Sequence, residues 1–156
     1  PGLPDNSPVP RSAALDLLEQ QARAFTGGAP AASLETASAG WSTQEWQHFL
    51  ESLLNEPLTA AQLADLDRTF GLTKRGNSEV LFLWLRTAIR NRYEPAMPAL
   101  ERFLTTQGRR KFLRPLYEDL MKTDWGKAEA QRIYPRARPL YHTVATSTLD
   151  PIVQVR

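Results

Sequence analysis

Signals that start and stop helices recur along almost the whole chain, and they restrict its possible folds more than any other feature. Trp41 and Trp46 flank one such start signal, where two apolar side chains can pack as a hydrophobic staple. Capping boxes, each a Ser or Thr followed three residues later by Glu or Gln, occur at Ser42-Thr43-Gln44-Glu45 and Thr59-Ala60-Ala61-Gln62. Glycines that can end helices follow at Gly27-Gly28, Gly71 and Gly108. This punctuation predicts an all-α protein.

Apolar residues at helical spacing place the predicted helices between these signals. We expect helices that begin near residues 11, 43, 60, 80, 95, 116, 125 and 140. The segment 29–40 is of low complexity and is expected to be a loop. Pro115 should kink or break the helix that follows Gly108, and Asp150-Pro151 should begin an irregular tail. Only residues 152–155 alternate as a short strand would.

The predicted helices form pairs joined by short turns. A spacing of about 35–40 residues per pair is typical of armadillo and HEAT solenoids, although no clean repeat is visible. We therefore expect an armadillo/HEAT-like right-handed superhelix of about seven to nine helices in two layers. Residues 1–10 would be a linker from a missing upstream domain, 11–150 the helical domain and 151–156 a tail. The chain starts with proline rather than methionine, which suggests a fragment of a longer polypeptide.

Composition excludes several classes of site. The chain contains no cysteine, which rules out disulfides and thiolate metal sites. His48 and His142 each lack a metal-ligating partner at helical spacing, so no metal site and no catalytic residue is predicted in this chain. No apolar run approaches the roughly 20 residues that span a bilayer, and the first residues do not resemble a signal peptide. We expect a soluble protein with no membrane contact and favour the cytoplasm as its compartment.

Charge is distributed unevenly along the chain. Residues 1–71 carry three Lys/Arg against nine Asp/Glu, whereas residues 72–156 carry sixteen against eight. Four cations of the basic half fall between Gln107 and Tyr117: Arg109, Arg110, Lys111 and Arg114. Cations near the free N–H groups of a helix start can bind an anion such as a carboxylate. They can equally pair with nearby acids and water on an exposed turn, and the residues alone leave both readings open.

Other charged residues give no sign of chemistry. Asp65/Asp67 and Glu118/Asp119 are carboxylates one or two positions apart, which do not converge on a helix, so we expect solvated charges. The Arg86/Arg90 pair is expected at the solvated edge of its helix. Phe112 and Tyr117 lie among the cations, but their spacing fits core packing better than nucleic-acid stacking, so no nucleic-acid partner is predicted.

Two stretches of the chain resemble the C-terminal domain of the leukotriene A4 hydrolase and aminopeptidase B family of zinc aminopeptidases. One is Asn77-Ser78-Glu79 with Phe82, Trp84-Leu85-Arg86 and Ile89; the other is Gln107-Gly108-Arg109-x-Lys111-Phe112-x-Arg114-Pro115-Leu116. The opening Pro1-Gly2-Leu3-Pro4 is similar to the linker that enters that domain. The resemblance thus extends over nearly the whole chain and is weakest in 29–40 and after residue 134.

The resemblance implies a role for two of the four cations. In that family an armadillo-like helical domain packs against a thermolysin-like zinc domain, which holds the zinc ligands and the general base, and against an N-terminal β domain. The helical domain forms one wall of the active-site cleft. Arg109 matches the arginine that binds the substrate carboxylate, and Lys111 matches the lysine that assists it. Arg110 stands where the family needs no cation, so its side chain is expected to point elsewhere.

These observations lead to two hypotheses of different kinds. In the first, the chain is the non-catalytic C-terminal domain of a zinc metalloaminopeptidase. Its partners are then the upstream zinc domain and short peptide substrates, and the isolated chain, without a zinc site, is inactive. In the second, the chain is a free-standing helical-repeat scaffold that binds an acidic protein or peptide through its basic half. Peptide specificity and epoxide hydrolase activity are not predicted, because both depend on residues outside this chain.

Overall fold

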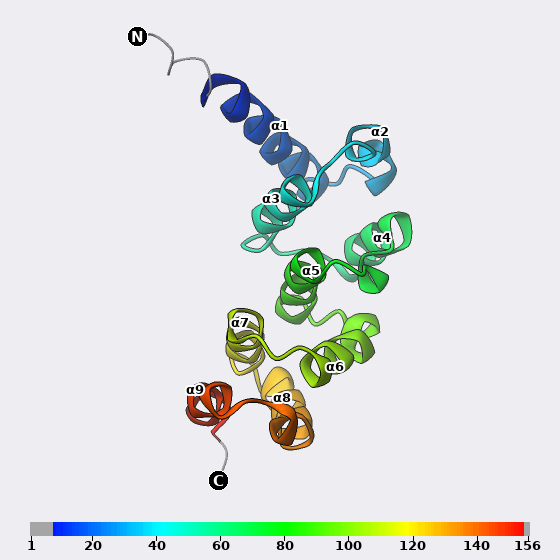
Figure 1. Ribbon diagram of the computed structural model, residues 1–156. Helices are drawn as coiled ribbons and strands as arrows, with labels where there is room; N and C mark the ends of the chain where they lie inside the picture. The colour runs from blue at the N-terminus through cyan, green and yellow to red at the C-terminus, as the bar shows by residue number, and fades with distance from the viewer. Residues whose placement is uncertain (1–7, 155–156) are drawn as a thin grey trace, which may run out of the picture. The chain divides into compact units, whose positions relative to one another are not determined.

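The computed structural model describes residues 8–154, and all regular secondary structure within that range is helical (Figure 1). The prediction of an all-α protein is confirmed, with nine α-helices among the described residues. The right-handed superhelix stays a prediction. The chain divides into two compact units, Pro1–Leu83 and Trp84–Arg156, and the division falls within one helix, α5. The linker predicted for residues 1–10 lies largely outside the described residues.

The first unit is built on the pairing of its longest helix, α1 (Pro8–Thr26), with α3 (Thr43–Leu53). Three apolar residues of that helix, Leu18, Ala22 and Phe25, are buried, and the helix packs directly on α3 (Figure 1). The elements of this unit are α1 (Pro8–Thr26), η2 (Ala31–Leu34), α2 (Glu35–Ser38), α3 (Thr43–Leu53), α4 (Ala60–Phe70), η3 (Leu72–Lys74) and the start of α5 (Ser78–Arg90).

Both predicted capping boxes form. At α3 the Ser42 hydroxyl accepts from the Glu45 N–H at 3.2 Å, and the Glu45 carboxylate accepts from the Ser42 N–H at 2.9 Å. Thr59 and Gln62 make the same reciprocal pair at the start of α4. Trp41 packs edge-on against Trp46 with ring centroids 4.9 Å apart, so the predicted staple is also confirmed. Local sequence alone therefore specifies where these two helices begin.

The segment predicted as a loop, residues 29–40, is instead largely helical. It forms η2 and the short helix α2, and it buries Ala31 and Leu34. The Ala31 N–H donates to the Asp65 carboxylate of α4 at 2.8 Å. The loop prediction was wrong because tertiary contacts, rather than local propensity, order this segment. The Asp65 carboxylate, which was predicted to be a solvated charge, therefore also binds a backbone N–H of this segment.

The second unit packs its helices around α7 and α8. Helix α7 contacts both α8 and α9, and α6 contacts α8. The elements of this unit are the end of α5, η4 (Glu94–Ala96), α6 (Met97–Thr106), α7 (Arg110–Leu120), α8 (Asp124–Ala137), η5 (Arg138–Leu140) and α9 (Thr143–Val153).

Two prolines lie inside helices, so Pro115 does not break its helix, and the chain is still helical after Asp150-Pro151, where a tail was expected to begin. Helix α7 continues through Pro115 to Leu120, and α9 continues through Pro151 to Val153. The short strand considered for residues 152–155 therefore does not form over 152–154. A proline removes one backbone donor and costs stability. Here buried side chains lie before and after each proline, namely Leu113 and Leu116 in α7 and Leu149 and Val153 in α9, and their packing retains the helix.

A buried group of tyrosines joins four elements of the second unit. The hydroxyls of Tyr117 in α7 and Tyr141 lie 2.9 Å apart, and the Tyr141 hydroxyl donates to the Leu104 carbonyl of α6. The Tyr134 hydroxyl of α8 donates to Asp150 of α9. Burial raises the pKa of Tyr141 to about 12. These bonds link α7 with α6 through Tyr141, and α8 with α9. Helix α7 carries the cationic cluster.

Candidate anion-binding site

The predicted junction between two helices is present at Gln107–Arg109. Helix α6 ends at Thr106, where the Gln107 N–H still donates to the Phe103 carbonyl at 2.8 Å. Helix α7 begins at Arg110, and Arg109 is its extended N-cap residue. No acidic residue lies in the first turn. Because the first N–H groups of a helix have no acceptor within it, they add partial positive charge to the four cations here.

Arg109 and Lys111, the two predicted site residues, lie against the same aromatic ring. The Arg109 Cζ is 5.7 Å from the ring centroid of Phe112, and the Lys111 Nζ is 4.9 Å from it. Both cations are exposed, whereas Phe112 itself is buried. None of the ion pairs among residues 8–154 includes Arg109. The two predicted residues thus contact the same ring, and the Arg109 side chain is exposed.

The other two cations of the cluster have partners elsewhere. The Arg110 guanidinium donates to the Thr148 hydroxyl of α9 at 3.1 Å, so its side chain points away from Phe112 as expected. Arg114 donates to Glu118, one turn later in α7, at 3.2 Å. Two of the four cations, Arg109 and Lys111, therefore contact the Phe112 ring. The other two bind polar side chains at the surface.

The structure contains a charged cluster that the sequence reasoning missed. The Asp119 carboxylate of α7 is only 1% exposed and accepts from Arg86 of α5 at 2.7 Å. Arg90 approaches the same carboxylate at 3.4 Å and Lys122 at 3.5 Å. The prediction of a solvated charge was wrong for Asp119, whereas Arg86 and Arg90 are partly exposed, as expected at a helix edge, and also pair with Asp119. Asp119 follows Leu116 by three positions, which places it on the buried face of α7, and this spacing was the available signal.

Both histidines make contacts within the helical structure. His48 of α3 lies 3.0 Å from Glu19 of α1 and joins these two helices. His142 is the N-cap of α9, where its Nδ1 accepts from the Val144 N–H at 3.2 Å. Among the described residues, no three His, Cys, Asp or Glu side chains gather as a metal site would require. Over the same residues, no helix has the length and apolar character needed to cross a membrane.

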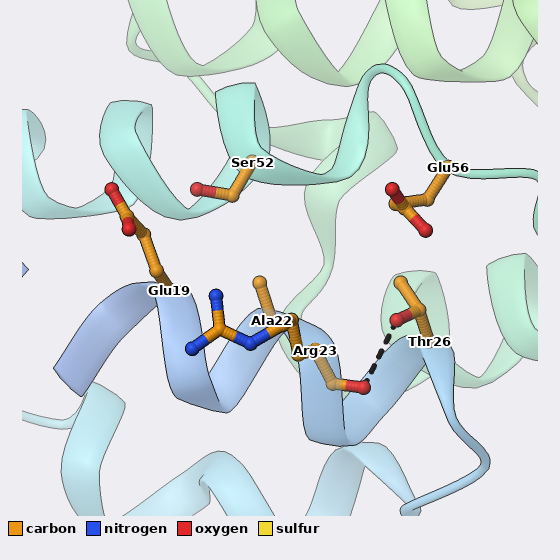
Figure 2. A pocket seen from close by; sticks show the side chains of 6 residues that line it. All are labelled: Glu19, Ala22, Arg23, Thr26, Ser52 and Glu56. Atoms are coloured by element: carbon orange, nitrogen blue, oxygen red, sulfur yellow. Dashed lines mark hydrogen bonds between the residues drawn. The ribbon is translucent and has the colours of Figure 1, made fainter. Parts of the chain in front are cut away.

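Two polar hollows occur in the first unit, both along the pairing of α1 with α3. The smaller, of about 260 Å³, lies between Arg23 and Thr26 of α1 and Ser52 of α3, with Glu19 and Glu56 at its edges (Figure 2). The Thr26 hydroxyl there donates to its own helix, at the Arg23 carbonyl. The larger hollow also lies along this seam and includes His48. Neither hollow contains a residue predicted to bind a ligand.

Comparison with known proteins connects this geometry to a family. The family model described as "Leukotriene A4 hydrolase, C-terminal" matches residues 41–153. A leukotriene A-4 hydrolase of Xenopus laevis is 34% identical over 92 residues, which are 59% of this chain and 15% of that protein. Leucine aminopeptidase 2 of Neurospora crassa is 28% identical over 114 residues, 72% of this chain and 17% of that protein.

A second fungal relative shows the same pattern. Leucine aminopeptidase 2 of Ajellomyces capsulatus is 31% identical over 98 residues, which are 62% of this chain and 15% of that protein. The chain thus spans only about one sixth of the length of the curated relatives it matches, which are a hydrolase and two aminopeptidases by name. The match of the family model covers more than half of the chain, including α7 with Arg109 and Lys111. The chain therefore belongs to the family of the leukotriene A4 hydrolase C-terminal domain, which also occurs in related aminopeptidases.

Proposed function

We propose that this chain is the C-terminal helical domain of a zinc aminopeptidase and forms one wall of its peptide-binding cleft. Arg109 and Lys111 bind the carboxylate of a short peptide substrate. The observation that carries the proposal is the placement of these two cations on one ring at the start of α7, with no ion pair on Arg109 in the described part of the chain. The membership of the family supplies the kind of enzyme.

The chemistry of the two side chains suits a carboxylate. A guanidinium offers a planar pair of donors that matches the two carboxylate oxygens, and an ammonium adds a point charge. The helix start contributes further positive potential. Binding the C-terminal carboxylate would fix the register of a short peptide relative to the reacting bond, which lowers the entropic part of the barrier. Zinc and the residues that activate water belong, in this proposal, to the rest of the polypeptide.

The test compares two substrates in the full-length enzyme. Arg109→Ala should lower kcat/KM for a tripeptide with a free carboxylate by about 10- to 150-fold, because a hydrogen bond to a charged group is worth about 1.5–3 kcal/mol. The same tripeptide as its C-terminal amide should be affected little. Zinc content should remain equal to that of the wild-type enzyme.

Arg110→Ala provides the matched control. It removes a guanidinium from the adjacent position, but one that donates to Thr148. We expect it to leave the ratio of kcat/KM for the free acid over the amide unchanged. An Arg109→Ala enzyme with a wild-type ratio would contradict the proposed role. A native protein without an upstream metalloprotease domain would favour the free-standing scaffold instead.

A further inference from the structure

We infer that Phe112 is a positioning residue for the carboxylate site, because its ring holds the Arg109 and Lys111 side chains where a carboxylate can reach both. The inference rests on the proposed function of those two cations. It assigns to a buried aromatic residue a part in substrate binding, although that residue would not itself touch the substrate.

The first support is the geometry of the contacts. Arg109 Cζ and Lys111 Nζ both lie within 6 Å of the Phe112 ring centroid, the range in which a cation is attracted to an aromatic ring. Arg109 precedes the first turn of α7 and Lys111 lies within it, so the backbone alone does not direct these two long side chains to one place. Their shared contact with one ring does.

The second support is the rigidity of the ring. Phe112 is 3% exposed and packs edge-on against Phe103 of α6, with centroids 5.7 Å apart. A ring fixed by the core can restrict exposed side chains that lie on it. Long Lys and Arg side chains lose considerable rotamer freedom when they bind a ligand, and a contact that restricts them beforehand reduces this loss.

The third support is the selection among the four cations. Arg110 and Arg114 belong to the same helix start, yet they are bound to Thr148 and Glu118. Arg109 and Lys111, the two residues assigned to the carboxylate, are the two cations of this group whose contact with the Phe112 ring is observed.

Fluorinated phenylalanines test the inference with little change in shape. Fluorine withdraws electron density from the ring face and weakens its attraction for cations. Phe112 is replaced in the full-length enzyme by its 4-fluoro, 3,5-difluoro and 3,4,5-trifluoro analogues. The same series at Phe49, a buried ring of the first unit that packs edge-on against Trp46, is the matched control. The readout is the ratio of kcat/KM for a tripeptide with a free carboxylate over that for its amide.

We expect the ratio to fall stepwise at position 112 and to stay constant at position 49. Each cation–π contact at an exposed site is worth a factor of about 2 to 5, so the trifluoro analogue should lower the ratio by about fivefold. Phe112→Leu, which removes the ring, should lower it at least as far, whereas Phe49→Leu should not. Thermal unfolding of each variant shows whether packing has changed equally at the two positions.

The possible outcomes separate this inference from the proposed function. If Arg109→Ala lowers the ratio but the Phe112 series leaves it constant, Phe112 does not position the cations and the carboxylate site stands. An equal fall at Phe112 and Phe49 would show a general effect of packing and would also overturn the inference. If Arg109→Ala leaves the ratio unchanged, the proposed function fails first, and the inference fails with it.

Discussion

Removal of the Asp119 carboxylate tests how much the buried charged cluster contributes to the stability of the second unit. Asp119 is buried and receives Arg86, Arg90 and Lys122 on its two oxygens. The substitution Asp119→Ala removes the carboxylate that these three cations share. Breaking a fully buried ion pair in this way costs about 3–5 kcal/mol.

Exposure of the cations reduces this figure. The side chains of Arg86 and Arg90 are 22% and 27% exposed and that of Lys122 is 63% exposed, so water can solvate part of the positive charge. We therefore expect a loss of about 2–3 kcal/mol in the free energy of unfolding, below the range for a fully buried pair. For a chain of this size the melting temperature would fall by about 5–10 °C.

The neighbouring residue provides the control. Glu118 also carries a carboxylate on α7 and pairs with Arg114, but the two side chains are 44% and 60% exposed. Glu118→Ala should cost no more than about 0.5 kcal/mol. The assay is urea unfolding followed by circular dichroism, with thermal unfolding as a second measurement. Equal losses for the two substitutions would refute the argument that burial makes the Asp119 cluster strong.

Two further predictions concern other parts of the second unit. In Gly126→Ala the new Cβ would lie 2.1 Å from the Leu120 carbonyl oxygen, so we expect a loss of about 1–3 kcal/mol by thermal unfolding, whereas Gly40→Ala enters open space and should cost little. Hydrogen bonds from Arg138 lower the pKa of Asp150 to about 2. A folded-state pKa below the unfolded value of about 3.9 stabilises the protein above that pH, and this contribution is lost as the pH falls from about 4 to 2. Asp150→Asn should therefore reduce the pH dependence of urea unfolding in that window, and a wild-type dependence in the variant would exclude the contribution.

The sequence predicted best those features that depend on neighbouring residues. The starts of α3 and α4 follow from the pairs at Ser42 and Thr59, which act within four residues. The end of α4 follows from Gly71, which adopts the left-handed φ of 60° that favours glycine at a helix end. Gly108 also indicated a helix boundary before Arg109, although α6 ends at Thr106 with an extended Gln107 and Gly108 does not adopt a left-handed φ.

Features that depend on distant residues could not be predicted. The Asp119 cluster joins residues 29–33 positions apart in sequence, and no local pattern indicates which arginine meets which carboxylate. The order of segment 29–40 depends on a hydrogen bond across 34 positions, from Ala31 to Asp65. The shared contact of Arg109 and Lys111 with Phe112 is a third case, because two exposed side chains have many rotamers and the sequence does not choose among them.

The position of α1 has a consequence for where this domain can be divided. The stretch that defines the family begins at residue 41, well after α1 ends at Thr26. Yet α1 packs directly on α3 and buries Leu18 and Phe25. Burying each such side chain contributes about 1.5–3 kcal/mol. A piece of this chain cut to residues 41–153 would therefore lack the helix that covers α3, and it should be less stable than the longer chain.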